Sequence, residues 1–426
     1  MAISKIKQLL ISVLLLAPAM AFASPDRYMG TGTCSSSNCH GSTHARKSSN
    51  VLQNEYFTWL KHDKHSQAYT VLLKADAKRM ASLMGLGDPA KEPLCLKCHS
   101  TYVPSAEQRG EKYSAEDGVS CESCHGPAER WLETHAVLGT THQQNLSNGL
   151  ADTVSLDKRA QLCVSCHYGD KDRRVTHDLY GAGHPRLSFE LDTYGVLEPK
   201  HWVVDEDYLR RKGPYSPLAA WFIGQETLAE GVVATLRSPA LSRNGTFPEL
   251  SVFDCFSCHH NLDEHQWKSR TYGGKPGKLN VNVAPLVMLQ HALLALDRPL
   301  AEELGQLVVS VKGSFQADGA SDALGKMEDL LKSRVHPLVM KLEPGEKTSA
   351  AVMRELATFA AAAESPKYEV AEQIGMGIQA AMATSPDLAK RYKSLLDKLF
   401  VTLKSPNHFD PGKFTDAAKK LAQKLQ

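Results

Sequence analysis

Beyond its first 23 residues, the sequence lacks a long apolar run. The best stretch, from Val283 to Leu296, contains Gln290 and His291 and is shorter than the roughly 20 residues that span a bilayer. An excess of charge of one sign is also missing, because 49 Lys and Arg residues face 47 Asp and Glu residues. We therefore expect no membrane span, and no basic surface that would bind nucleic acid.

The first 23 residues have the layout of a secretory signal. Two lysines precede an apolar run from Leu9 to Ala17, and Ala21-Phe22-Ala23 forms a small-x-small cleavage site. A membrane anchor is the alternative, but the run is short and Pro18 follows it. We predict that residues 1–23 are a signal peptide and that the remaining chain is periplasmic or secreted. The two lysines account for the formal net charge of +2, so the remaining chain is neutral.

No cysteine stands alone. The ten cysteines form five pairs, and a histidine follows the second cysteine of every pair. Four pairs read C-x-x-C-H, and the first pair has four spacer residues. The five motifs are Cys34 and Cys39 with His40, Cys95 and Cys98 with His99, Cys121 and Cys124 with His125, Cys163 and Cys166 with His167, and Cys255 and Cys258 with His259. C-x-x-C-H is the attachment motif of c-type haem, in which the two thiols bind the porphyrin and the imidazole binds the iron.

Disulfide bonds and structural zinc are the alternatives for paired cysteines. An even number of cysteines in an exported chain suits disulfides, and two C-x-x-C units suit a four-cysteine zinc site. Neither alternative requires a histidine after each pair, and zinc would leave one pair over. With only 18 histidines in 426 residues, five Cys-His steps are not expected by chance. We predict five covalently bound haem c groups, attached through the ten cysteines and ligated by the five motif histidines.

Composition divides the chain into two regions. Residues 24–285 contain every cysteine and all five tryptophans, so we predict a pentahaem cytochrome c domain of short helices and long loops around stacked haems. Residues 286–426 show helical patterning and predict a helical bundle. The predicted fold class is therefore mainly α.

Individual helices are predicted in both regions. Apolar residues between Asn54 and Leu73 indicate one helix. Three Ser-Pro or Asp-Pro steps, at Ser365-Pro366, Ser385-Pro386 and Asp410-Pro411, predict N-caps followed by proline in the first helical position. After the second of these steps, apolar residues at helical spacing predict a buried face; they are Leu388, Tyr392, Leu395, Leu396, Leu399 and Leu403.

The order of the motifs resembles the cytochrome c-554 family of multihaem cytochromes over about residues 28–185. The resemblance rests on Trp59 with His65 in a His-Ser-Gln-Ala sequence, and on Gly118-Val-Ser before the third motif, with Gly126-Pro127 and then His135 after it. The four-residue spacer of the first motif, the fifth motif and the helical C-terminal region depart from the family pattern.

The resemblance implies ligands on the second axial side of the irons. It assigns His65 and His135 as distal ligands to neighbouring haems and makes His184 the closest candidate for a third, with His177 and His201 as rivals. In the founding type of the family, the haem of the second motif has no protein ligand on its distal side. The iron at His99 therefore either has an open distal position or binds one of four residues there, namely His44, His62, Met80 and Met84. No distal ligand carries over to His259.

Three functions fit these features. We expect an electron carrier between a donor dehydrogenase or quinol-linked complex and a terminal reductase, with other redox proteins as partners and no catalytic residue. An enzyme acting on a small nitrogen or sulfur species at a five-coordinate haem is the first alternative. Pentahaem nitrite reductases are similar in haem number, but their catalytic haem uses C-x-x-C-K, which this sequence lacks. The second alternative is a structural cytochrome that docks or self-assembles through residues 286–426.

Overall fold

The structure, a computed structural model, describes residues 26–47, 51–238, 249–255, 258–259, 280–314, 319–362 and 367–426. The predicted signal peptide lies outside these residues. Within them the chain is helical and contains no β-strand, only two isolated bridges, Tyr28 with Arg109 and Phe253 with Val281. The predicted mainly α class is confirmed.

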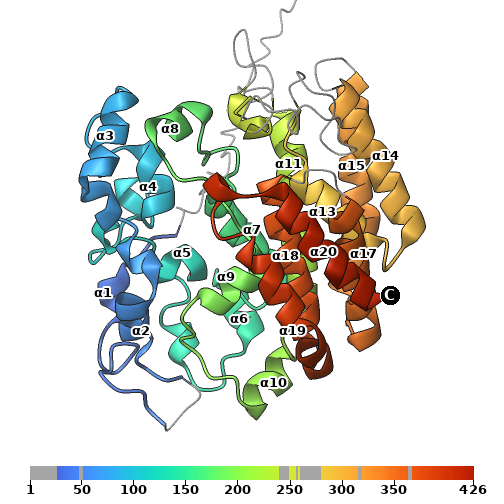
Figure 1. Cartoon of the computed structure of the whole chain (residues 1–426). Helices are drawn as coiled ribbons and strands as arrows, with labels where there is room; N and C mark the ends of the chain where they lie inside the picture. The colour runs from blue at the N-terminus through green and yellow to red at the C-terminus, as the bar shows by residue number, and fades with distance from the viewer. Residues whose placement is uncertain are drawn as a thin grey trace, which may run out of the picture.

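The first half of the chain consists of short helices separated by loops (Figure 1). Its α-helices are α1 (Thr31–Cys34), α2 (Glu55–His62), α3 (Ala75–Leu83), α4 (Pro93–His99), α5 (Cys121–His125), α6 (His142–Ser147), α7 (Leu156–His167), α8 (His177–Ala182), α9 (Leu191–Leu197) and α10 (Glu206–Lys212). Its 3-10 turns are Lys64–Gln67, Thr70–Leu73, Ala106–Gln108, Ala115–Asp117 and Thr134–Ala136.

The predicted single helix from Asn54 to Leu73 is wrong. Helix α2 ends at His62, and Asp63 adopts an extended conformation with φ −90° and ψ 124°. The Asp63 carboxylate accepts a hydrogen bond from the His65 amide at 2.9 Å and so caps the 3-10 turn that follows. The break turns the chain just before His65, which an unbroken helix would point elsewhere.

The second half forms a bundle of longer helices. They are α11 (Pro217–Arg237), α13 (Ala284–Leu293), α14 (Arg298–Ser314), α15 (Gly319–Leu330), α16 (His336–Met340), α17 (Glu346–Ala362), α18 (Tyr368–Ala383), α19 (Pro386–Val401) and α20 (Pro411–Leu425). A π-helical turn, Leu331–Val335, joins α15 to α16, and 3-10 turns occupy Leu250–Val252 and Pro406–His408.

Two of the three predicted N-caps are confirmed. The Ser385 hydroxyl accepts from the Leu388 amide at the start of α19, and Asp410 accepts from the amides of Gly412 and Lys413 at the start of α20. A proline follows each cap as the first helical residue. Ser365 and Pro366 lie outside the described residues. The predicted apolar face of α19 is buried at Leu388, Tyr392, Leu396 and Leu399.

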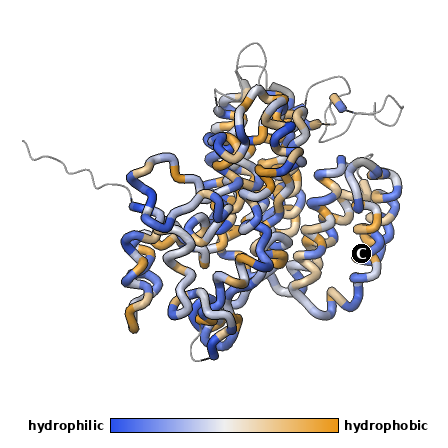
Figure 2. Tube along the Cα trace, turned by 90° about the vertical axis from the view of Figure 1, so that its left-hand side faces the viewer, coloured by the Kyte–Doolittle hydropathy of each residue, from blue (hydrophilic) through white to orange (hydrophobic). Residues whose placement is uncertain are grey.

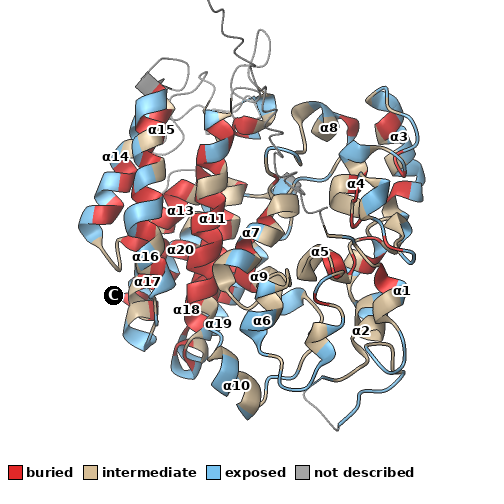
Figure 3. Ribbon diagram, turned by 180° about the vertical axis from the view of Figure 1, so that it is seen from behind, coloured by how far each residue is buried: buried red, intermediate tan, exposed pale blue. Residues whose placement is uncertain are grey.

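Helix α11 is the centre of the main hydrophobic core. Its Leu218, Trp221 and Phe222 are fully buried, and it contacts α7, α9, α13, α15, α16 and α18 (Figure 3). The core therefore unites helices on both sides of residue 285, and the predicted domain boundary falls within α13. The division into a haem domain and a helical domain stays a prediction.

Residues before 160 build little apolar core of their own. Among the described residues of this part, one hydrophobic cluster is found, and its buried members are Leu72, Ala90 and Leu96. This part of the chain faces the viewer in Figure 2, where hydrophilic and apolar residues mix along the trace. None of the helices in the described residues has the length and hydropathy of a membrane span.

Candidate haem-binding sites

Three motifs lie at the ends of helices, which places their functional side chains on one side. The second, third and fourth motifs close α4, α5 and α7 with His99, His125 and His167. In a helix, residues three and four positions apart share a face. The spacing C-x-x-C-H therefore presents two thiols and an imidazole toward the same space. We number the five motifs in chain order as sites 1 to 5.

The first and fifth motifs are turns closed by a backbone hydrogen bond between their ends. At site 5 the His259 amide donates to the Cys255 carbonyl at 2.8 Å. At site 1 the His40 amide donates to the Cys34 carbonyl at 3.1 Å, despite two additional residues in the spacer. The longer spacer is thus accommodated as a wider turn whose ends still meet.

All ten cysteines are free thiols, and several from different motifs lie close together. The Cys34 thiol donates a hydrogen bond to Cys121, which raises the pKa of Cys34 and lowers that of Cys121. Cys98 donates in the same way to Cys166, which lowers the pKa of Cys166 to about 6. Site 1 therefore adjoins site 3, and site 2 adjoins site 4.

Sites 3 and 4 are also neighbours. Burial and then Glu198 raise the pKa of the Cys124 thiol to about 12, and the thiols of Cys163 and Cys166 lie near enough to contribute to the rise. The attachment thiols therefore form a continuous row in the order site 1, site 3, site 4 and site 2.

Every motif histidine faces a histidine from outside the motifs. The five pairs have nearly the same separation of ring centres, between 6.1 and 6.4 Å. They are His40 with His135 at 6.2 Å, His99 with His184 at 6.4 Å, His125 with His201 at 6.2 Å, His167 with His65 at 6.1 Å and His259 with His177 at 6.2 Å.

This separation fits one metal ion between two imidazoles. A metal binds an imidazole nitrogen at about 2 Å, and each nitrogen lies about 1.1 Å from its ring centre, so two ligands on opposite sides have centres about 6.2 Å apart. Within the described residues, no three His, Cys, Asp or Glu side chains converge as metal ligands would. Two imidazoles alone make a poor site, but they complete the coordination of an iron that a porphyrin already holds.

Hydrogen bonds orient several of these imidazoles. Five of them have their Nδ1 engaged within 3.2 Å, which leaves Nε2 for a metal. The partners are Glu55 Oε2 for His40 at 3.0 Å, Asp63 Oδ1 for His65 at 2.9 Å, and the carbonyls of Ala68 for His99 at 3.0 Å, Trp131 for His135 at 3.2 Å and Pro185 for His184 at 2.8 Å.

Burial keeps other imidazoles neutral, which is the form that binds metal. It lowers the pKa of His125 and of His167 to about 4, and it lowers the pKa of His99. The carboxylates of Glu55 and Asp63 act in the opposite direction and raise the pKa values of His40 and His65.

The structure brings the sequence-predicted histidines together in pairs. His135, His65 and His184 lie opposite His40, His167 and His99. His184 therefore occupies the position at site 2 that the resemblance left open, whereas His44 and His62 are exposed. The roles of all these residues as haem ligands stay predictions.

Sequence reasoning left sites 2 and 5 without an assigned distal ligand, and it did not choose the histidines that face sites 3 and 5. His201 and His177 face these sites, although both were only rivals for the place of His184. A signal was present in the number of histidines, because five motifs require five partners and only three had been assigned. No local pattern around His177 or His201 distinguishes them from surface histidines.

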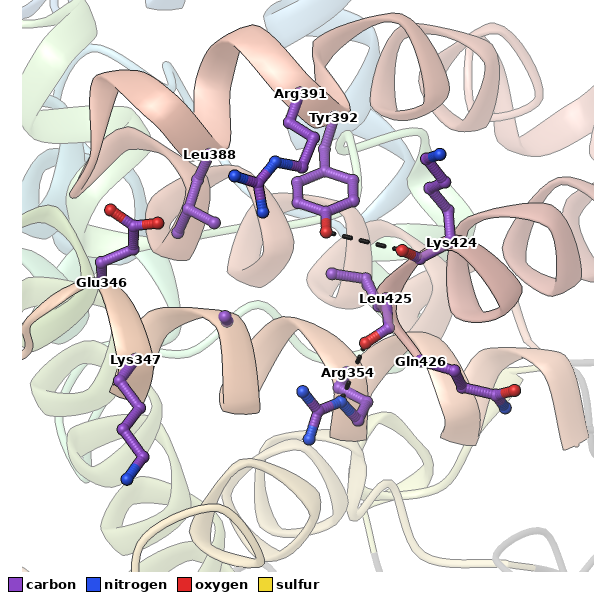
Figure 4. Close-up of a pocket in the computed structure, with 10 residues that line it drawn as sticks. Glu346, Lys347, Arg354, Leu388, Arg391, Tyr392, Lys424, Leu425 and Gln426 are labelled. Carbon is purple, nitrogen blue, oxygen red and sulfur yellow. Dashed lines mark hydrogen bonds between the residues drawn. The ribbon is translucent and has the colours of Figure 1, made fainter.

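A pocket in the described residues lies away from these sites. It has a volume of about 520 Å³ and is lined by residues of α17, α19, α20 and the chain end, without a cysteine or histidine (Figure 4). Arg354 Nε donates to the Leu425 carbonyl at 3.0 Å on its floor. None of the residues that line the pocket belongs to the five motifs.

Comparison with known proteins identifies the first part of the chain. Residues 33–126 match the family model of cytochrome c554 and c-prime, and this stretch includes the first three motifs and His65. Neither a curated protein nor a solved structure matches the chain. The predicted resemblance is thereby confirmed, and c-type haem is the cofactor of this family. Residues 33–126 are therefore similar to the cytochrome c554 and c-prime family.

Proposed function

We propose that this protein is a periplasmic pentahaem cytochrome c that transfers electrons. The observation that carries the proposal is the equal separation of five histidine pairs, each of which joins one motif histidine to one other histidine. Each pair supplies both axial ligands of one haem, and the cysteines of the motif anchor that haem covalently. The complete set of axial ligands is thus His40 and His135, His99 and His184, His125 and His201, His167 and His65, and His259 and His177.

When bound, haem c supplies the one-electron chemistry of its iron. The two histidines of each pair would hold the iron between them, which would leave no position at the iron for a substrate. The scarcity of apolar core before residue 160 supports a region organised around bound porphyrins. The row of attachment thiols supports short separations between neighbouring sites, as electron transfer requires.

A catalytic role depends on an open axial position, and site 2 was the expected place for one. His184 lies 6.4 Å from His99, ring centre to ring centre, and its Nδ1 is held by the Pro185 carbonyl. This arrangement favours two protein ligands at site 2 and so disfavours the enzyme alternative.

Partners and compartment follow from the same proposal. An exported electron carrier docks with a donor, such as a dehydrogenase or quinol-linked complex, and with a terminal reductase. The N-terminal signal sequence supports the periplasm, because covalent haem attachment and cleavage of such a signal both belong to exported proteins.

The proposal is tested on protein purified from a host with working cytochrome maturation. We expect a mature mass that includes five haems, and ferric electron paramagnetic resonance (EPR) spectra in which all five are low-spin. Cyanide or nitric oxide should leave the spectra unchanged. A high-spin haem that binds either molecule would overturn the electron-carrier proposal in favour of catalysis.

The ligand set is tested at site 3, where His201 faces His125. His201→Ala should convert one of the five haems to the high-spin state, and free imidazole should restore the low-spin signal. The matched control is His142→Ala, because His142 lies at the surface beside Asp152. Five low-spin haems in His201→Ala would show that His201 is not a ligand.

A further inference from the structure

One short segment provides an imidazole to two different sites. His177, the first residue of α8, faces His259 of site 5, and His184, just beyond the end of α8, faces His99 of site 2. The seven-residue separation corresponds to a distance on the order of 10 Å along a helix. Sites 2 and 5 thus lie at opposite ends of the same helical segment.

Local interactions hold the two ends of this segment in a fixed relation. The Thr176 hydroxyl caps the start of α8 by accepting from the Leu179 amide. At the other end Gly183 has φ +113°, a conformation that favours glycine, and the His184 amide donates to the Leu179 carbonyl at 3.1 Å. A residue with a side chain at position 183 would be strained, so the turn that aims His184 depends on glycine.

Each end of the segment is also held by a neighbouring part of the chain. On the side of site 2, Arg79 of α3 donates to the Ala182 carbonyl at 3.4 Å, and α8 packs against α3. On the side of site 5, Glu249 accepts from the amides of His177 at 2.7 Å and Ser251 at 3.0 Å. Glu249 therefore joins the start of α8 to the 3-10 turn that leads into Cys255.

Tyr180 occupies the interval between the two sites. Its ring lies 6.4 Å from that of His184, with an angle of 70° between the planes. Burial raises the pKa of Tyr180, and the nearby Cys255 thiol adds to this increase. A hydrogen bond with the backbone of Leu187 lowers the pKa and so acts against both effects. Tyr180 thus lies beside the His184 ring of site 2 and near the Cys255 thiol of site 5. Figures 1 and 3 show α8 between α3 and α4 on one side and α11 on the other.

We propose that the segment 176–184 couples the fifth haem site to the second, so that site 5 extends the row of sites beyond site 2. The order along the protein becomes site 1, site 3, site 4, site 2 and site 5, which makes sites 1 and 5 the two ends of the conduit. Glu249 is a positioning residue that aligns His177 with His259. This inference rests on the proposed function, because it takes the five histidine pairs as haem ligands.

The first test replaces the shared aromatic ring in the full-length, haem-loaded protein. Tyr180→Ala should alter the low-spin EPR signals of two haems. One of them should be the haem whose signal changes in His177→Met, and the other should be the haem whose signal changes in His184→Met. Tyr180→Phe keeps the ring and should leave both signals unchanged. The matched control is Tyr194→Ala, because the Tyr194 ring lies 5.1 Å from that of His167 and should affect site 4 alone. If Tyr180→Ala alters one signal or none, the coupling is wrong.

The second test does not depend on how Tyr180→Ala folds. His177→Met should raise the midpoint potential of one haem, because a methionine ligand favours reduced iron. If site 5 neighbours site 2, the potential of the haem altered by His184→Met should shift as well, while the other three stay unchanged. A redox titration followed by EPR measures all five.

The outcomes separate the inference from the function on which it rests. Suppose that His177→Met changes one haem, but that the potential of the site 2 haem stays the same. Site 5 is then not coupled to site 2, whether or not the potential of another haem moves, and the ligand set stands. If His177→Met changes no haem, then His177 is not a ligand, and both the ligand set and the coupling are wrong.

Discussion

A carboxylate distinguishes two of the proposed histidine ligands from the others. Nδ1 of His40 faces Glu55 and Nδ1 of His65 faces Asp63, whereas His99, His135 and His184 face backbone carbonyls. An anion on Nδ1 makes the imidazole a stronger electron donor and stabilises oxidised iron. Sites 1 and 4 should therefore have lower potentials than site 2.

The effect of each carboxylate is measurable one site at a time. Glu55→Gln and Asp63→Asn should each raise the potential of a single haem. An interaction worth about 1–2 kcal/mol corresponds to about 40–90 mV for one electron. Asp152→Asn is the control, because its histidine partner, His142, faces no motif. Redox titrations in which all five potentials match those of the unaltered protein would show that the carboxylates do not tune the irons.

Glu122, inside the third motif, serves the fold rather than the haem. Its side chain is almost fully buried and accepts from the amides of Met29 at 2.8 Å, Gly30 at 2.7 Å and Ala128 at 2.8 Å. These bonds tie the start of the described chain to the loop after α5. Burial raises the pKa of Glu122, and the three amide donors oppose the rise.

Replacing this carboxylate should destabilise the N-terminal part of the protein. Glu122→Gln keeps the shape but turns an amide group toward backbone donors, which leaves buried groups without partners at a cost of about 2–4 kcal/mol. Denaturant unfolding measures the loss. Glu129→Gln is the control, because Glu129 makes a surface ion pair with Arg27. Equal midpoints for Glu122→Gln and the unaltered protein would contradict this role.

At the scale of elements, prediction succeeded where a signal was local. The caps Ser385 and Asp410 and the apolar face of α19 follow from a few adjacent residues. The break after α2 was missed because apolar spacing alone carries through Asp63, whose cap forms only in the folded turn. Local sequence patterns thus predict where a helix starts more reliably than where a helix breaks.

The contact between α11 and α18 depends on a glycine that the sequence does not single out. A methyl group at Gly377 would lie 2.6 Å from the Trp221 ring, so Gly377→Ala should destabilise the protein by about 1–3 kcal/mol. Gly325 of α15 has open space around it, so Gly325→Ala should instead stabilise by about 0.5–1 kcal/mol. Thermal unfolding compares the two variants. A stabilising Gly377→Ala would mean that α11 and α18 lie farther apart than described.

At the scale of the whole molecule, the motifs were readable from the residues alone, whereas His65, His135 and His184 were named only through the family resemblance. Each C-x-x-C-H contains its thiols and proximal imidazole within five residues, so sequence alone names them. His135, which faces His40, lies 95 residues after it, and His65, which faces His167, lies 102 residues before it. Such pairs form only when the chain folds, and without a family pattern nothing marks His201 or His177 in advance.

The same dependence on distant segments applies to the helical bundle. Helix α11 precedes the fifth motif in sequence, yet its Leu218, Trp221 and Phe222 are buried in one core with α13, α17 and α18. Removing the helices after α11 would expose these side chains, and each contributes about 1.5–3 kcal/mol when buried. A domain has only about 5–15 kcal/mol of net stability, so their exposure is more than the fold can tolerate.

A chain that ends at Val283, before α13, should therefore fail to fold around α11. Helix α7 contains the fourth motif and packs against α11. The truncation should therefore disrupt site 4 as well as the helical bundle. We expect little soluble protein from a host with cytochrome maturation, with low helical content by circular dichroism and fewer than five haems by mass. A soluble, monodisperse chain with five haems would instead identify residues 286–426 as a separable module, as a docking or assembly role requires.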